Sequence, residues 1–330
     1  MVLTETIPIR VRVRQSAVLR AEDSLNVLTF HAMGTVCRIS TDARARGTTA
    51  YFDRLLNWVA DFEATYSRFL NSSLISRINA AAGREWVDVD EHTDHLLSLC
   101  GEMVFLTGGA FDPTALPLIR LWNWKANPPA IPDEAAIQKA RELVGWRHVQ
   151  RRPGAVFLSR PGMCLDLGGI GKEYAVDAVL GLAESHGLRD VLVDFGQDIR
   201  VQGRPPGRPA WHIGLENPSH PGSCWGSVAV TNHAVASSGN YLRCFMHNGR
   251  RYGHIIDPRS GYPADNPCLG VNIVAPNCTL AGILSTSACL LGPKAGFELI
   301  NRTFGASGAI VTETGNLITP RFNEYLVHQN

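Results

Sequence analysis

The sequence predicts an α+β fold built on antiparallel sheet. Segments with strand and helix character are interspersed along the chain, mostly without the regular strand–helix–strand alternation of a parallel sheet. From residue 198 to residue 276, short strand-like runs alternate with turns such as 204–207 (Arg-Pro-Pro-Gly). The chain has 330 residues, 45% hydrophobic and 18% charged, which is enough for one large globular domain or two smaller ones.

Three helices are predicted in the first half of the chain. Residues 48–66 form an amphipathic pattern in which Leu55, Val59 and Phe62 recur at i, i+4 and i+7. The other two are predicted over 92–107, ended by Gly108 and Gly109, and from a cap at Asp133 to about Gly145.

The second half begins with a short predicted strand at 162–165, which turns into a helix over 172–186. Residues 190–195 have the composition of a buried strand. Two helices are then predicted, over 280–291 with Thr279 as its cap and over 294–303, before a closing hairpin of strands.

Arginines alternate with valines near the start of the chain, a period of two that predicts an exposed strand rather than a nucleic-acid-binding arm. The arginines are Arg10, Arg12, Arg14 and Arg20, with Val11 and Val13 between the first three.

Composition excludes several function classes. The net charge of +1 gives no support for binding nucleic acid. No run of about 18 apolar residues predicts a membrane-spanning helix, and the first 30 residues lack the apolar core of a signal peptide. No cysteine precedes Cys37, so a lipid-modified N-terminal cysteine is not expected, and none of the eight cysteines forms a CxxC pair. We expect a cytoplasmic protein with reduced thiols and neither a zinc site nor a membrane anchor.

The segment 166–177 is the most informative stretch, because three glycines lie where the predicted strand turns into a helix. Glycine there lets a ligand touch the main chain, and the N–H groups at a helix start favour an anion such as phosphate. Asp166 and Lys172 add a ligand for a metal or ribose and a partner for phosphate. A tight turn alone would explain the glycines, but the carboxylate, the lysine and the third glycine favour a nucleotide.

Other segments offer weaker signals. His254 could move a proton near neutral pH, and it stands three residues before Asp257, so on a strand the two side chains need not meet. Asp112 could bind a nucleoside or simply close a turn, and Met33 lies in a short loop between strands. Residues 194–199 could be a plain hairpin. The hydroxyls at 285–287 could bond back to their own helix or ligate Mg²⁺.

Taken in order, these segments resemble the FAD:protein FMN transferases of the ApbE type. Several motifs in the same order are more specific than any one of them. The resemblance covers residues 30–320 approximately. The matching stretches are 32–35, 66–69, 76–79, 109–114, Pro117, Leu118, Trp122, 166–172, 174–177, 196–199, 237–241, 254–261 and 281–286.

The resemblance implies a two-lobed fold with FAD bound between the lobes. It also implies Mg²⁺-dependent transfer of FMN from FAD to a threonine or serine hydroxyl of a target flavoprotein, with release of AMP. Residues 26–330 would form the ApbE-like domain, and residues 1–25 would be an N-terminal extension. By position, the nucleotide would be surrounded by Met33, Phe69, Ala110, Phe111, Asp112, Asp166, Gly169, Lys172, His254 and Ile256.

For the chemistry, the resemblance implies that the Gly169 carbonyl and the Thr286 hydroxyl face the metal, and His254 is the candidate base. Two positions depart from the family pattern. Gly282 stands where the family usually has a metal-binding aspartate, and Gln197 replaces the second of two glycines. The loss of a carboxylate leaves open an FAD-binding protein with lost or weakened transfer. An FAD pyrophosphatase, in which water replaces the acceptor hydroxyl, is a variant of the transferase. Without the resemblance, a nucleotide-binding scaffold with a structural role is a further alternative.

Overall fold

The computed structural model describes residues 7–122, 130–239 and 244–327. Its centre is a nine-stranded sheet in which every neighbouring pair is antiparallel, as the sequence predicts. The strands, in their order across the sheet, are β1 (Val18–Glu22), β2 (Leu25–Ala32), β3 (Thr35–Asp42), β7 (Val191–Phe195), β8 (Asp198–Gln202), β11 (Ala234–Gly239), β14 (Cys268–Ala275), β15 (Ser307–Thr312) and β16 (Gly315–Ile318).

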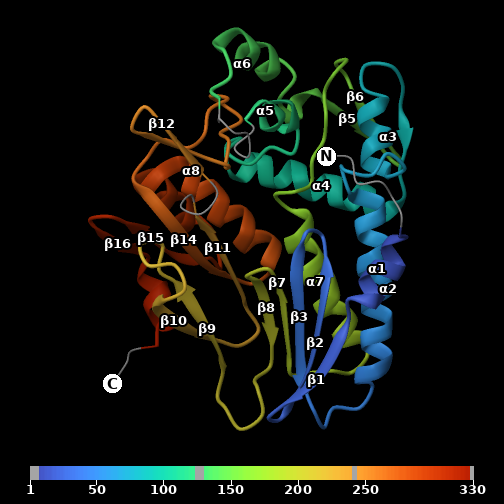
Figure 1. Cartoon of the computed structure of the whole chain (residues 1–330), viewed down its shortest axis with the longest axis vertical. Coiled ribbons are helices and arrows are strands. Elements are labelled where there is room, and N and C mark those ends of the chain that lie inside the picture. Colours follow the sequence, from blue (N-terminus) through green and yellow to red (C-terminus); the bar gives the residue numbers. More distant parts are fainter. Residues whose placement is uncertain (1–6, 123–129, 240–243, 328–330) are drawn as a thin grey trace.

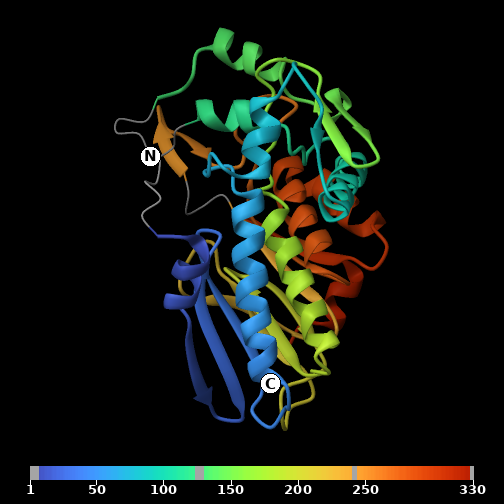
Figure 2. The ribbon, with the colours of Figure 1, turned by 90° about the vertical axis from the view of Figure 1, so that its right-hand side faces the viewer.

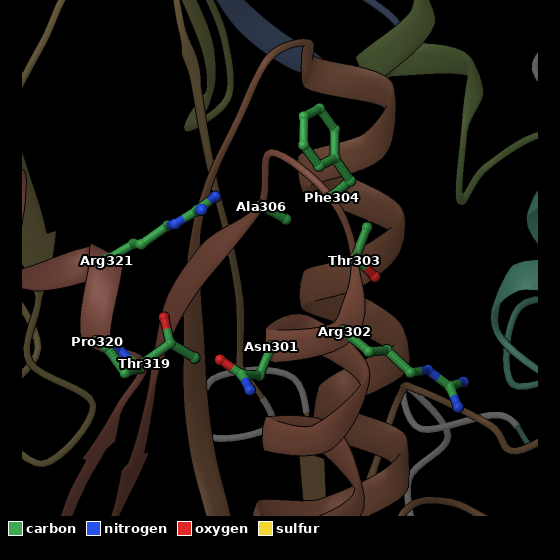
Figure 3. A pocket seen from close by; sticks show the side chains of 8 residues that line it. All are labelled: Asn301, Arg302, Thr303, Phe304, Ala306, Thr319, Pro320 and Arg321. Atoms are coloured by element: carbon green, nitrogen blue, oxygen red, sulfur yellow. The ribbon is translucent and has the colours of Figure 1, made fainter.

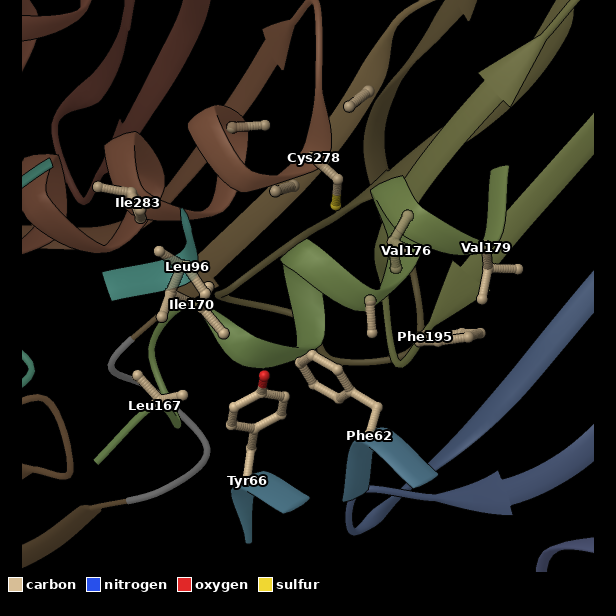
Figure 4. Close-up of a cluster of buried hydrophobic side chains, with 14 of the residues drawn as sticks. Phe62, Tyr66, Leu96, Leu167, Ile170, Val176, Val179, Phe195, Cys278 and Ile283 are labelled. Atoms are coloured by element: carbon tan, nitrogen blue, oxygen red, sulfur yellow. The ribbon is translucent and has the colours of Figure 1, made fainter. Parts of the chain in front are cut away.

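Three helices cover one face of this sheet and bury the main hydrophobic core against it. They are α2 (Thr48–Tyr66), α7 (Gly171–Ser185) and α8 (Cys278–Arg302). Figure 2 shows α2 and α7 side by side, and Figure 4 shows Phe62 and Tyr66 of α2 beneath α7. The other face packs on β9 (Trp211–Glu216), β10 (Cys224–Val230) and the short helix η2 (Pro320–Glu324).

A smaller group of elements lies at one end of the sheet and is called the small lobe below (Figure 1). It contains the helices α3 (Leu74–Ala80), α4 (Glu91–Leu106), α5 (Leu116–Leu121) and α6 (Glu134–Arg141), and the strands β4 (Val87–Asp88), β5 (Val149–Arg152), β6 (Ala155–Leu158), β12 (Cys244–His247) and β13 (Arg250–Gly253). The molecule thus has the two-lobed α+β architecture that was expected.

Most of the predicted elements are confirmed. Helix α2 has the predicted bounds, Asp133 caps α6 by accepting from the Ala136 N–H at 2.8 Å, and the closing hairpin is β15–β16. The two predicted C-terminal helices form one element, α8, broken at Gly292, whose φ of 79° precedes Pro293. Its cap is Asn277 and not Thr279, because the Asn277 side chain accepts from the Leu280 N–H at 2.8 Å.

The predicted N-terminal strand is wrong. Residues Ile9–Gln15 form a helix, α1, and only Arg20 lies on a strand. The arginines of α1 contact acidic residues of α2, with Arg10 bound to Asp61 at 2.6 and 2.7 Å. Tertiary contacts with a neighbouring helix therefore override the alternation of arginine and valine in the sequence.

The predicted strand at 162–165 is also wrong, because no strand within the described ranges pairs with these residues. The Asn79 side chain pairs with Leu165 instead: its Oδ1 accepts from the Leu165 N–H at 2.6 Å, and its Nδ2 donates to the Leu165 carbonyl at 2.9 Å. One amide group thus supplies both hydrogen bonds that a neighbouring strand would have supplied.

Candidate functional site

Two tight turns meet at one end of the nine-stranded sheet. The β2–β3 turn consists of Met33 and Gly34 and the β7–β8 turn of Gly196 and Gln197. Because β3 pairs with β7, Gly196 lies against Thr35, whose Oγ1 would be 2.2 Å from a Cβ added to the glycine. Met33 and Gln197 have backbone φ angles of 50° and 74°, a conformation that residues other than glycine rarely adopt. Such strain is typical of functional sites.

The turn that leads into α7 lies beside them and contains Asp166, Gly169 and Lys172. Asp166 is mostly buried, and its Oδ1 accepts from the Gly168 N–H at 3.0 Å while Oδ2 is 3.1 Å from Nε of Arg68. Burial raises the pKa of Asp166, and the charge of Arg68 acts in the opposite direction. The Arg68 guanidinium also stacks over the ring of Phe69 at 4.3 Å, and Phe69 itself is 62% exposed.

Lys172 extends from the first turn of α7 toward β8. Its Nζ forms an ion pair with the buried carboxylate of Asp198 and is 3.6 Å from Oε1 of Glu173. Lys172, the predicted partner of a phosphate, therefore lies close to two carboxylates. Its ammonium group offsets part of the negative charge at this end of the sheet.

The predicted residues of the 109–114 loop approach this turn from the small lobe. A Cβ added to Gly169 would lie 3.4 Å from the ring of Phe111, so the ring packs on that glycine. Asp166 donates its N–H to the Pro113 carbonyl at 2.8 Å. Ala110 and Phe111 are both buried.

Asp112 closes the same loop. Its carboxylate accepts from the N–H and Oγ1 of Thr114 at 2.9 and 2.6 Å, and from the Trp146 N–H at 3.0 Å. Burial raises the pKa of this carboxyl, and the hydrogen bonds from Thr114 oppose the shift. Asp112 therefore acts as the loop-closing residue that the sequence offered as one of two possibilities.

Helix α8 brings hydroxyl groups to the site. The Ser238 Oγ is 2.7 Å from the Ser285 Oγ and 2.9 Å from Thr286 Oγ1. Ser285 also donates to the Gly282 carbonyl at 2.9 Å, which is the back-bonding expected of a serine within a helix. Thr286 is half-buried and is held by Ser238 from β11.

His254 and Ile256 lie directly after β13, in the small lobe. Ile256 packs in a separate hydrophobic cluster with Trp122, whose Nε1 donates to the Gly261 carbonyl at 2.8 Å. The Asp257 carboxylate accepts from Arg259 Nη2 and Nε at 2.7 and 2.9 Å. Two residues of the resembling motifs, Asn240 and Tyr241, lie outside the described part of the chain.

Sequence reasoning missed Glu173, a carboxylate that is 8% exposed at this site. The helical spacing of the sequence indicates its burial, because Glu173, Val176 and Leu180 follow one another at i, i+3 and i+7. These residues therefore share the buried face of α7. A charged residue on an apolar helix face is rare without a partner or a function.

A cavity of about 380 Å³ lies away from all of these residues, at the C-terminal end of α8 (Figure 3). It is lined by residues 301–304, Ala306 and 319–321, and none of the predicted site residues is among them. A second cavity, of about 220 Å³, borders the β2–β3 turn at Gly34 and Thr35. The larger of these two cavities therefore does not coincide with the predicted site residues.

Within the described ranges, no three or more His, Cys, Asp or Glu side chains form a group that could hold a metal. The eight cysteines are free, and six of them are buried. No helix among the described residues is long and apolar enough to cross a membrane. A magnesium site here would therefore have to combine few carboxylates with neutral oxygen ligands.

Comparison with known proteins gives a consistent result. Residues 33–311 match the model of the ApbE family. An FAD:protein FMN transferase of Treponema pallidum is 31% identical over 84% of this chain and 82% of its own length. One from Vibrio cholerae is 31% identical over 75% of this chain and 74% of its own. The crystal structure of the ApbE protein from Thermotoga maritima, at 30% identity, covers 92% of this chain and 100% of that one with a TM-score of 0.83.

Proposed function

The chain belongs to the ApbE family, and from that premise we propose that it transfers the FMN half of FAD to a threonine or serine hydroxyl of a target flavoprotein. AMP would be released, and Mg²⁺ would be required. Relatives named FAD:protein FMN transferase support the reaction class.

One observation supports the proposal most strongly. The start of α7 contacts β8 through the ion pair of Lys172 with Asp198, the two strained turns pack on each other at Gly196 and Thr35, and Glu173 of α7 meets Gly282 of α8 one turn before Thr286. The start of a long helix favours the negative charge of a pyrophosphate. The exposed ring of Phe69 and the flexible side chain of Met33 are suited to a flat aromatic ligand such as the flavin.

In the proposed reaction, the acceptor hydroxyl oxygen bonds to the phosphorus of the FMN phosphate. The bond from that phosphorus to the AMP oxygen breaks, and AMP leaves with the electron pair. His254 accepts the hydroxyl proton, since an imidazole can do so near neutral pH. Lys172 and the start of α7 offset the negative charge that builds on AMP.

The Gly169 carbonyl and the Thr286 hydroxyl would hold Mg²⁺, which prefers oxygen ligands. When bound, the ion would neutralise charge on the pyrophosphate and polarise it toward attack. The oxygen chemistry of these groups fits a hard cation, and phosphate oxygens and water would complete the coordination.

The direct test supplies the protein with FAD, Mg²⁺ and an acceptor domain that a known transferase can modify. We expect covalent FMN on the acceptor by mass spectrometry, equimolar AMP by chromatography, and loss of both after chelation of the metal. An acceptor with its threonine replaced by valine should stay unmodified. AMP with free FMN would instead identify an FAD pyrophosphatase, and FAD binding without AMP would identify a flavin-binding protein that has lost transfer.

The proposed base has its own test within the same assay. His254→Asn should lower kcat by about a hundredfold, in keeping with the usual contribution of general-base catalysis. FAD affinity should change little by comparison. An unchanged kcat would remove His254 from this role.

A further inference from the structure

We propose that Glu173 supplies, from α7, the metal-binding carboxylate that position 282 lacks. This inference rests on the proposed function, because it names a ligand for the Mg²⁺ of the transfer reaction. The inference explains how the metal could keep a carboxylate ligand although position 282 is glycine. In this chain, the carboxylate would come from the helix that faces α8 and not from α8 itself.

The first argument is steric. A Cβ added at Gly282 would lie 2.4 Å from Cγ, 3.1 Å from Cδ and 3.3 Å from Oε1 of Glu173. A real Cβ does not approach another carbon atom this closely, so the Glu173 side chain occupies the space that a side chain at position 282 would need. Glu173 is 8% exposed and cannot easily move aside.

The second argument is the state of the Glu173 carboxylate. Among the described residues, Oε2 of Glu173 is buried and has no hydrogen-bond partner. Its other oxygen is 3.6 Å from Nζ of Lys172, but that ammonium group also pairs closely with Asp198. A buried acceptor without a partner is costly, and a cation is a ligand that would satisfy it.

The third argument is the register of the two helices. Asp177 of α7 contacts the N–H groups of Cys278 and Thr279 at the start of α8, and four residues back along α7 Glu173 meets Gly282. The helices are thus antiparallel, and each step of four residues advances about 6 Å along the axis. Followed past the start of α7 at Gly171, the same direction leads from Glu173 toward Gly169 and from Gly282 toward Thr286.

Together these groups form a donor set that suits Mg²⁺. Glu173 would provide one carboxylate, Thr286 a hydroxyl and Gly169 a main-chain carbonyl. Mg²⁺ commonly binds one or two carboxylates together with substrate phosphates and water. A single carboxylate is also consistent with the described residues holding no group of three acidic, histidine or cysteine ligands.

The test measures binding of Mn²⁺, as a probe of the Mg²⁺ site, to the full chain by electron paramagnetic resonance with FAD in fixed excess. We expect Glu173→Gln to weaken Mn²⁺ binding about tenfold or more, because it removes the charge and keeps the shape. FAD binding without metal should be unchanged. The control is Glu184→Gln, an exposed carboxylate near the other end of α7, which should bind Mn²⁺ as the native chain does.

A swap of positions tests the geometry separately. Gly282→Asp alone should lower the melting temperature and should not tighten Mn²⁺ binding, because Glu173 fills the space. The double variant Glu173→Gly with Gly282→Asp should recover both the melting temperature and most of the Mn²⁺ affinity. Tighter binding in Gly282→Asp alone, or native Mn²⁺ affinity in a folded Glu173→Gln, would overturn the inference.

The inference and the proposed function can fail independently. Native transfer activity together with native Mn²⁺ affinity in Glu173→Gln would refute only the role of Glu173. Weakened Mn²⁺ binding in Glu173→Gln, with no FMN transfer by the native chain, would support the carboxylate ligand and refute only the reaction.

Discussion

Met33 has a backbone conformation that another residue, such as asparagine, would adopt at a lower cost in stability. The β2–β3 turn gives Met33 a φ of 50° and Gly34 a φ of 74°. The β12–β13 turn has nearly the same conformation, with φ of 49° and 75°, but there the residues are Asn248 and Gly249. Asn-Gly is the pair that such two-residue hairpins prefer. The same chain thus uses the favourable pair in one turn and methionine in the other, as expected if Met33 contacts the flavin in the proposed function.

Met33→Asn should therefore separate stability from binding. We expect the free energy of unfolding to be unchanged or to rise by up to about 1 kcal/mol, because asparagine tolerates this conformation better. FAD affinity should fall severalfold because the apolar side chain is lost. Chemical denaturation and flavin fluorescence measure the two quantities. The matched variant Asn248→Met should destabilise the protein, and full FAD affinity in Met33→Asn would show that Met33 does not contact the flavin.

Gln197 also has a positive φ, which is unfavourable for a residue other than glycine. Its side chain is exposed, and unlike that of Met33 it has no proposed contact with the flavin. Its φ is 74°, and its N–H is held by Asp194 Oδ1 at 2.8 Å. Gln197→Gly should raise the free energy of unfolding by about 1 kcal/mol. Gln202→Gly, on strand β8 of the same hairpin, should lower it by about 0.5–1 kcal/mol, because glycine weakens a regular strand. A fall in stability for Gln197→Gly would mean that its side chain makes a contact worth more than the strain.

At the scale of elements, Asp177 joins α7 to α8. Its carboxylate accepts from the N–H groups of Cys278 and Thr279 at 2.8 and 2.9 Å, from Thr279 Oγ1 at 2.6 Å, and from Arg200 Nη1 at 2.9 Å. Two of the N–H groups at the start of α8, which have no partner within the helix, are satisfied in this way by another helix. The joint also sets the register that places Glu173 opposite Gly282.

Asp177→Ala should cost about 2–4 kcal/mol of unfolding free energy, because it leaves Arg200 and the two N–H groups without their partner. Asn277→Ala, which removes only the side-chain cap of α8, should cost about 1 kcal/mol. Urea denaturation measures both changes. Equal costs for the two variants would show that Asp177 acts only as an additional cap and not as the joint between the helices.

The sequence predicts elements well where local pattern and tertiary contacts agree. The period of α2 and the composition of β7 indicated them correctly. The helix α1 was missed because contacts with α2 decide its structure, and residues 162–165 were misassigned because their hydrogen-bond partner is a side chain distant in sequence. Glu173 belongs to the same class, since its significance depends on a glycine of another helix.

At the scale of the whole molecule, the N-terminal helix α1 is linked to the β2–β3 turn from outside the region that matches the family model. Arg12 of α1 contacts Glu63 Oε1 at 2.5 Å, and Glu63 Oε2 accepts from the Met33 N–H at 3.0 Å. The family match begins at residue 33. A residue before the matched region thus helps to hold the strained turn in place.

Arg12→Ala should weaken FAD binding severalfold, while its effect on unfolding free energy stays at about 1 kcal/mol or less, as for a partly exposed ion pair. The effect on binding should shrink at high salt, because the native contact is itself screened. Arg10→Ala is the matched control, because Arg10 binds Asp61, and both side chains are largely exposed. Equal FAD affinities for Arg12→Ala and Arg10→Ala would show that the contact of Arg12 with Glu63 does not influence FAD binding.

The contact between Glu173 and Gly282 also constrains how such a site can evolve. A chain with glutamate at position 173 cannot gain aspartate at position 282 while the glutamate fills that space. If the glutamate is lost first, the intermediate has glycine at position 282 and no carboxylate from either helix. If Glu173 is the metal ligand, an exchange between the two arrangements would pass through a chain with impaired metal binding or packing in either order, and descendants of each arrangement should retain it. Positions 173 and 282 are then expected to change together.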